Sequence, residues 1–266
     1  MPADTARVVA TYSLASDTFD RLPFWHHFGE RTVALAGLAP GERVVDLCCG
    51  SGGSALPAAR AVGPTGSVLG VDVTPALVDL ARARAAREGL AQARFDVADV
   101  APLTLPPRSA DAVVSVFGLF FMDDIPGLLH RAWAWLRPGG RLVSAVWGQV
   151  VLAPGEAYFW DAVTAEDSSL DHISPASLLA TPEALARVHL EAGLPAPEVT
   201  RERWRMPLET PDDFWPVILG TSNRGVLEAL PPPAQARVKA GVIDRLRRER
   251  VTALDMEALV AVARRT

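Results

Sequence analysis

The sequence is poor in cysteine and has no long apolar run. Its only two cysteines, Cys48 and Cys49, are adjacent, and neighbouring residues rarely form a disulfide bond. Two thiols without a nearby third ligand do not make a zinc site, so we expect no metal. No apolar run approaches the roughly 20 residues of a membrane-spanning helix, and residues 1–20 lack the apolar core of a secretory signal. These absences predict a cytoplasmic protein without a membrane span.

An excess of basic residues is also missing. The chain has 26 Lys and Arg against 31 Asp and Glu, a formal net charge of −5. Because nucleic-acid-binding proteins usually carry a basic face, we expect no nucleic-acid partner. Apolar residues make up 49% of the 266 residues and charged residues 21%, which indicates a globular chain with ample core. A small-molecule substrate is the expected partner, and a homodimer stays possible.

Apolar runs alternate with helical stretches after the first 40 residues. The expected strands are 43–48, 67–73, 93–97, 112–116 and 141–147, and the helices between them are 53–62, 75–88 and 125–136. This alternation predicts an α/β fold with a parallel sheet covered by helices on both faces. Further along, we expect helices at 182–192 and 234–248 and strands near 197–204 and 253–263.

The central motif is VVDLCCGSGGSA, residues 44–55. An apolar strand runs into a glycine-rich turn that opens a helix, and Gly50 and Gly52 allow the backbone to turn tightly and approach a ligand. The second expected strand ends at Asp72, whose carboxylate can accept hydrogen bonds from both hydroxyls of a ribose. Asp72 could instead cap the helix that follows, although Thr74 is the better candidate for that position.

The same glycine spacing also fits a dinucleotide-binding fingerprint. Asp46 lies on the strand four residues before Gly50, where a carboxylate is awkward beside a pyrophosphate but suits a cofactor that carries an ammonium group. Asp99 follows the third strand and could receive an adenine amine, although it could also be a turn residue. Asp46 therefore argues against a nicotinamide-dependent oxidoreductase, which we keep as a less favoured hypothesis.

The ordered motifs resemble class I S-adenosylmethionine (SAM) dependent methyltransferases, in particular the group similar to the menaquinone and ubiquinone methyltransferases. The matching pieces cover about residues 40–148 and are VVDLCCGSG, VLGVDVTPALVDLARARA, FDVADV, SADAVVSVFGLFFMDD and LRPGGRLVSAVWG. The resemblance implies a Rossmann-like fold with SAM as cofactor. The chain departs from the family at Cys48, where glycine is common. It also lacks the Asn-Pro-Pro-Tyr motif of enzymes that methylate the amino groups of nucleic-acid bases.

The resemblance also assigns the cofactor-binding residues. They are Asp46, Gly50 and Gly52 at the methionine end, Asp72 at the ribose, Val73 on the adenine, Asp99 and Val100 at the adenine amine, Phe117 near the methyl group, and Tyr12 and Trp25 in the segment closing over the cofactor.

Four regions follow from these assignments. We expect an N-terminal helical lid at 1–40 and a SAM-binding Rossmann-like core at 41–148. Residues 149–230 would form a substrate-side insertion, and 231–266 a helix and strand that complete the core.

The expected reaction is methyl transfer to an oxygen or carbon of a small, largely apolar metabolite, such as a quinone-like or secondary metabolite. His26 and His27 lie in the lid, where a histidine could deprotonate a hydroxyl acceptor; a solvent-facing pair of histidines is the competing interpretation. The alternative function is a SAM-binding protein of this fold that catalyses a cyclisation or rearrangement, or binds without methyl transfer.

Overall fold

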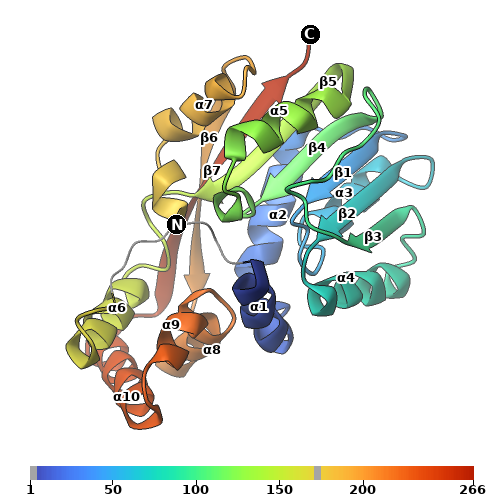
Figure 1. Ribbon diagram of the computed structural model, residues 1–266. Coiled ribbons are helices and arrows are strands. Elements are labelled where there is room, and N and C mark those ends of the chain that lie inside the picture. The colour runs from blue at the N-terminus through green and yellow to red at the C-terminus, as the bar shows by residue number, and fades with distance from the viewer. Residues whose placement is uncertain (1–4, 171–174) are drawn as a thin grey trace.

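A computed structural model describes residues 5–170 and 175–266. Its centre is a seven-stranded sheet in the order β3-β2-β1-β4-β5-β7-β6 (Figure 1). The five parallel strands are β1 (Arg43–Leu47), β2 (Ser67–Asp72), β3 (Ala93–Val97), β4 (Ala110–Val116) and β5 (Leu136–Trp147). β7 (Ala253–Arg264) pairs antiparallel with β5, and β6 (Glu198–Pro207) pairs antiparallel with β7. The expected α/β fold with a Rossmann-like sheet is confirmed.

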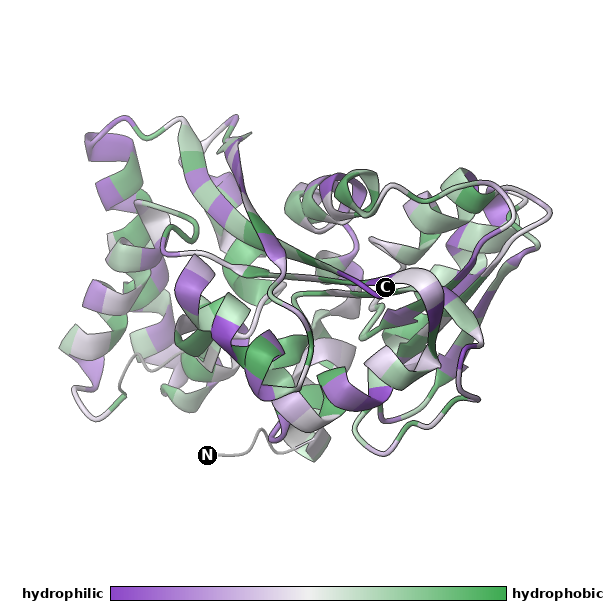
Figure 2. Cartoon of the chain, turned by 90° about the horizontal axis from the view of Figure 1, so that it is seen from above, coloured by the Kyte–Doolittle hydropathy of each residue, from purple (hydrophilic) through white to green (hydrophobic). Residues whose placement is uncertain are grey.

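Helices cover both faces because alternate strand residues point to opposite sides of the sheet. Val44 and Val68 pack with α2 (Pro23–Ala36), α3 (Ala55–Val62) and α4 (Pro75–Arg87). Val45 and Val71 pack on the other face with α5 (Ile125–Trp135) and α7 (Pro182–Glu191). Seen from above, the hydrophobic residues follow the strands, and the hydrophilic residues lie mostly on the outward helix faces (Figure 2). The inner strands β1, β2, β4, β5 and β7 are therefore buried on both sides, as their apolar composition requires, whereas the edge strands β3 and β6 are largely exposed.

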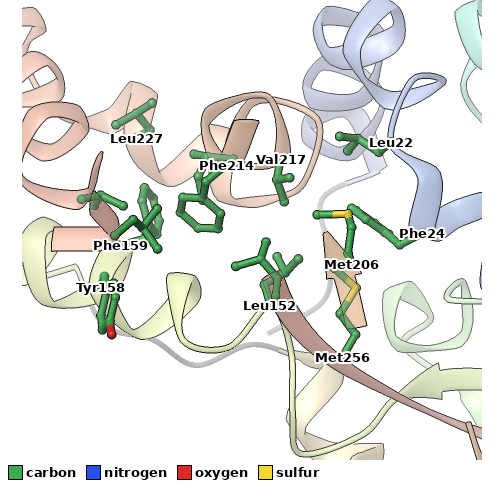
Figure 3. Packing of buried hydrophobic residues seen from close by; sticks show 14 of the residues in the cluster. Leu22, Phe24, Leu152, Tyr158, Phe159, Met206, Phe214, Val217, Leu227 and Met256 are labelled. Atoms are coloured by element: carbon green, nitrogen blue, oxygen red, sulfur yellow. The ribbon is translucent and has the colours of Figure 1, made fainter. Parts of the chain in front are cut away.

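The long strands β6 and β7 extend beyond the sheet into a cluster of helices that we call the cap (Figure 1). Its members are α6 (Gly155–Glu166), α8 (Phe214–Leu219), α9 (Asn223–Ala229) and α10 (Pro232–Arg248). Phe159, Phe214 and Leu227 meet Met206 and Met256 from the strand ends in one apolar cluster (Figure 3). Leu22 and Phe24 join the same cluster (Figure 3), so the N-terminal segment packs against the cap.

The packing divides the C-terminal half differently from the expected regions. α7 and β6, expected inside an insertion at 149–230, belong to the core layers. α10, expected to complete the core with 231–266, packs on α6 in the cap, where Arg245 pairs with Asp161 at 2.7 Å and Arg237 with Glu166 at 2.6 Å. Only β7 of that final region joins the sheet. An amphipathic helix shows which face is buried but not what it packs against, so the sequence could not assign α10.

The N-terminal helix α1 (Thr5–Phe19) and the N-terminal end of α2 lie at the carboxyl ends of β1, β2 and β4, and the rest of α2 packs on the sheet face. Arg84 of α4 holds this segment by donating hydrogen bonds to Asp20 (2.8 Å) and to the carbonyl oxygen of Ser51 (3.2 Å). No helix in the described part of the chain is long and apolar enough to cross a bilayer.

Candidate functional site

A cavity with about 950 Å³ of space, open to solvent, lies at the carboxyl ends of β1, β2 and β4, under α1 and α2; we call it the loop cavity. In open α/β sheets, ligands bind at this edge of the sheet. Eight of the ten residues expected to bind the cofactor line it: Tyr12, Trp25, Gly50, Asp72, Val73, Asp99, Val100 and Phe117. Residues distant in the sequence thus meet at one site.

Asp72 ties together the two turns that form the floor of the cavity. One carboxylate oxygen accepts a hydrogen bond from the Gly50 N–H (2.9 Å), and the other accepts one from the Thr74 N–H (2.8 Å). Burial raises the pKa of Asp72 above its ordinary value, and these hydrogen bonds offset only part of the rise. Each carboxylate oxygen can accept more than one hydrogen bond. The side chain can therefore hold the loop and still receive ribose hydroxyls.

Gly50 and Gly52 have different roles in the turn. Both have a positive φ, 51° and 88°, a conformation that favours glycine. Gly50 lines the cavity, but Gly52 does not; a Cβ on Gly52 would lie 3.0 Å from Cγ of Leu56, inside the fold. Gly52 therefore shapes the turn from outside the described cavity wall. Cys48 also has a positive φ, 58°, which explains why glycine suits its position.

Asp46 lies behind the loop and is fully buried. The Ser54 hydroxyl, which lines the cavity, donates a 2.7 Å hydrogen bond to Oδ2 of Asp46. Oδ1 of Asp46 and Oγ of Ser51 are buried without a hydrogen-bond partner in the described residues. Buried polar atoms are nearly always partnered, so these two atoms fit a polar ligand group such as the ammonium and carboxylate of a bound amino acid. The expected cofactor fits this donor and acceptor set, although Asp46 does not itself line the cavity.

We expect Asp46→Asn to change how stability depends on pH. Burial, reinforced by the charge of Asp72, raises the pKa of Asp46 to about 7. Between pH 4 and 7 the folded protein therefore keeps a proton that the unfolded chain has released, so this group makes stability fall as pH rises. As the pH rises from 4.5 to 8, the free energy of unfolding of Asp46→Asn should increase relative to that of the cofactor-free parent by on the order of 2–4 kcal/mol. Denaturant titrations across this range test it, and parallel pH profiles for the two proteins would contradict it.

Asp99 and Val100 form the adenine side of the expected site. Oδ1 of Asp99 accepts a 2.8 Å hydrogen bond from the Ala101 N–H, which is the turn contact that the competing interpretation anticipates. Asp99 nevertheless lines the cavity, and buried Val100 lies beside it. The turn therefore positions the carboxylate at the cavity wall, and the adenine role stays a proposal.

Aromatic rings close the other side of the cavity. Phe19 and Trp25 stack with centroids 4.8 Å apart, and Tyr12 meets Phe19 edge-on at 5.7 Å. Phe117 stacks on Trp147 at 3.9 Å. Burial raises the pKa of Tyr12, and the nearby charge of Asp72 adds to the effect, so its hydroxyl is a donor and not a base at neutral pH.

The structure does not bring His26 or His27 to a cavity wall. Arg84 donates to Nδ1 of His26 (3.3 Å), and Nε2 donates to the carbonyl oxygen of Asp20 (3.1 Å), because a guanidinium only donates and a carbonyl only accepts. The His27 ring stacks on Trp204 of β6 at 4.4 Å. Neither ring lines the loop cavity or the second cavity described next. The described geometry therefore does not support the expected histidine base in the lid: His26 has both ring nitrogens engaged, and the ring of His27 stacks on the outer strand.

A second, larger cavity of about 1590 Å³, also open to solvent, lies between the sheet and the cap; we call it the cap cavity. Tyr12, Trp25 and Phe117 line both cavities, so the two cavities adjoin at these rings. The aromatic lining of the cap cavity continues with Phe24, Phe120, Trp147 and Trp160, and its polar side chains include Gln149, Glu156, Thr221, Ser222 and Asn223.

Most of the residues that line the cap cavity belong to no recognised sequence motif, so the sequence did not predict this cavity. Trp160, Glu156 and Asn223 line this cavity and lie outside every sequence motif named above. In the loop cavity, Ser51, Ser54 and Thr74 are additional polar wall residues. Their position in or directly after the glycine-rich and Asp72 turns is the signal that could have identified them. In the described residues there is no cluster of three or more metal-ligating side chains.

Comparison with known proteins gives the same assignment as the geometry. Residues 44–140 match a family of methyltransferase domains. The chain is 36% identical over 138 residues to an aklanonic acid methyltransferase of Streptomyces sp. (strain C5), covering 51% of this chain and 63% of that protein. It is 33% identical over 144 residues to a 2-phytyl-1,4-naphtoquinone methyltransferase of Trichormus variabilis, covering 52% and 63%. The matches thus span less than two thirds of these relatives.

A likeness in structure extends over more of the chain. The solved structure of a SAM-dependent methyltransferase from Aquifex aeolicus superposes with a TM-score of 0.53 at 14% identity, covering 90% of this chain and 89% of that one. At this identity the likeness concerns the fold. Residues 44–140 therefore match the methyltransferase domain family, and the chain has the Rossmann-like fold seen in the class I SAM-dependent methyltransferases.

Proposed function

We propose that the protein is a SAM-dependent methyltransferase that methylates an oxygen or carbon of a small, largely apolar metabolite. The observation that carries this proposal is the wall that the two cavities share. Tyr12, Trp25 and Phe117 line both a cavity whose polar groups fit SAM and a larger aromatic cavity. Methyl transfer needs a donor and an acceptor in contact, and two cavities that adjoin at the same aromatic rings support this arrangement.

The residues of the chain would act mainly by positioning. SAM supplies an electrophilic methyl group on its sulfonium. Asp72 and the loop around Gly50 would hold the ribose side, and Ser51, Ser54 and Asp46 the amino-acid end. Trp25 and Phe117 would present apolar faces near the reacting centre, where the electron-rich face of an aromatic ring favours a cation such as the sulfonium. The Arg84 contacts with Asp20 and Ser51 would keep α1 and α2 closed over the site.

A labelling experiment tests this function. The protein is incubated with SAM carrying a deuterated methyl group and a small-molecule extract of the source cells. We expect one class of metabolite to gain a single labelled methyl group, with an equal amount of SAM converted to S-adenosylhomocysteine. The Asp72→Asn variant serves as the control for cofactor-dependent labelling. A product of changed structure but unchanged mass, with SAM intact, would contradict methyl transfer and support the cyclisation alternative.

A further inference from the structure

Buried hydrophilic side chains are rare in the wall of the cap cavity. Among the described residues that line it, Thr221 and Asn223 are the two that are both hydrophilic and buried, each with 8% of its surface exposed. The Thr221 hydroxyl donates a hydrogen bond to the carbonyl oxygen of Ile218 (3.3 Å). The carboxamide of Asn223, the only asparagine of the chain, has no hydrogen-bond partner in the described residues. Asn223 is therefore the buried hydrophilic residue of this wall whose hydrogen bonds the fold leaves open.

The carboxamide of Asn223 faces the open space of the cavity. Neither of its polar atoms is among the fully enclosed atoms that lack a partner. Asn223 and Val226 are three apart in α9, share a helix face and both line the cavity. The residues between and beyond them use other faces of the helix. Arg224 donates to the carbonyl oxygen of Leu14 in α1 (2.8 Å), and Leu227 is buried in the apolar cluster of the cap.

The start of α9 is held beside α1, the helix that carries Tyr12 (Figure 1). A Cβ on Gly225 would lie 3.7 Å from Oγ1 of Thr11, and the Arg224 hydrogen bond to Leu14 joins the same two helices. Tyr12 follows Thr11 directly and lines both cavities. A ligand held by Asn223 therefore lies in the part of the cap cavity that borders α1.

The chemistry of this wall describes the ligand that it fits. An asparagine amide offers two N–H donors and one accepting oxygen. A buried amide that is left unpaired costs free energy, so a ligand with an oxygen at this position is favoured over the same ligand without it. The rings of Phe24, Phe120 and Trp147 belong to the same wall, and such rings favour a flat aromatic ligand through stacked and edge-to-face contacts.

We propose that Asn223 is a specificity-determining residue that binds a carbonyl or hydroxyl oxygen carried by a planar aromatic acceptor. The amide N–H groups donate to this oxygen, and the amide oxygen accepts from a hydroxyl where the ligand has one. The inference rests on the proposed function in one respect, which is that the ligand is a methyl acceptor. Recognition of the ligand by Asn223 does not itself require methyl transfer.

Three probes of one shape test this recognition. 2-Acetylnaphthalene, 1-(2-naphthyl)ethanol and 2-ethylnaphthalene share a ring system and substituent length, and carry a carbonyl, a hydroxyl and no oxygen, respectively. Equilibrium dialysis with protein saturated with S-adenosylhomocysteine gives the Kd of each. Asn223→Leu keeps the approximate size of the side chain and removes its hydrogen bonds. We expect the ketone, the alcohol or both to lose about 3- to 10-fold in affinity relative to 2-ethylnaphthalene, and the probe that loses more identifies the recognised oxygen.

Ser222→Ala is the matched control. Ser222 lines the same cavity but is exposed, so water can replace any hydrogen bond that it makes, and this variant should keep the parental ratios of affinity. Asn223→Ala, which removes the amide without adding an apolar branch, should repeat the result of Asn223→Leu. Affinity for S-adenosylhomocysteine should stay parental in all three variants, because no residue of α9 lines the described wall of the loop cavity.

Parental affinity ratios in both Asn223 variants would overturn the proposal. Failure of all three probes to bind the parent would also overturn it, as would an equal loss in Ser222→Ala. Ratios lost in the Asn223 variants alone, together with no labelled methyl product in the labelling experiment above, would uphold recognition by Asn223 and count against the proposed function.

Discussion

Gly29→Ala is expected to lower the free energy of unfolding by about 3 kcal/mol, near the upper end for an overpacked site, and to weaken cofactor binding. A Cβ at Gly29 of α2 would lie 2.2 Å from the carbonyl oxygen and 2.5 Å from the carbonyl carbon of Gly53. Both atoms are backbone of the loop that carries the cavity, so no side chain can turn away. α2 would have to move off the loop, taking Trp25 from the wall between the two cavities.

Denaturant unfolding and calorimetry with S-adenosylhomocysteine measure the two parts of this effect. Gly241→Ala provides the matched control, because a Cβ at this helical position of α10 meets nothing within 4 Å. That change should stabilise the protein by about 1 kcal/mol through helix propensity and leave cofactor affinity unchanged. Parental stability and affinity in Gly29→Ala would show that α2 does not pack directly on the loop.

Asp72→Asn is expected to weaken S-adenosylhomocysteine binding by roughly 10–100-fold, the loss of about 1.5–3 kcal/mol for hydrogen bonds to a charged group. Both carboxylate oxygens accept hydrogen bonds from backbone N–H groups, those of Gly50 and Thr74. An amide has one accepting oxygen, so its NH₂ group would face one of these donors. The loop should therefore loosen while the ribose contacts weaken.

Titration calorimetry checks the affinity, and thermal unfolding with and without ligand shows how much of the loss comes from the loop. Asp79→Asn on α4 is the control: its side chain is 71% exposed and pairs with Arg82 on the surface, so we expect parental binding. Equal affinity of Asp72→Asn and the parent, in a folded protein, would contradict the placement of the ribose at Asp72.

Local patterns predicted the strands and turns that build the loop cavity. Three signals were local: the alternating or continuous apolar runs, the glycines at 50 and 52, and the aspartate at the end of β2. Each depends only on neighbouring residues and on permitted backbone angles. The assembled site follows from these elements because the ends of parallel strands meet at one edge of a sheet. Gly52 and Asp46 show the limit of such reasoning: both were expected at the cofactor, and both lie behind the wall.

In the lid and the cap, side-chain orientation and helix packing could not be predicted from local sequence patterns. His26 and His27 were expected to face the methyl group because they lie in the closing segment. The orientation of their rings instead depends on Arg84 and Trp204, 58 and 177 positions away in the chain. The place of α10 against α6 likewise depends on residues far apart in the chain, because Phe159 and Val163 of α6 are buried in one apolar cluster with Val238 and Val242 of α10.

The sequence by itself determined the α/β class, the strand and helix alternation and the cofactor-binding turns, because each is encoded in periodicity and in residues with special backbone conformations. The tertiary structure decided that Tyr12, Trp25 and Phe117 line two adjoining cavities and that Glu156 lines the second. The reason is physical: these side chains come from elements that meet only when the N-terminal helices and the cap pack onto the sheet. Which apolar faces then bury each other depends on the shape of the whole assembly.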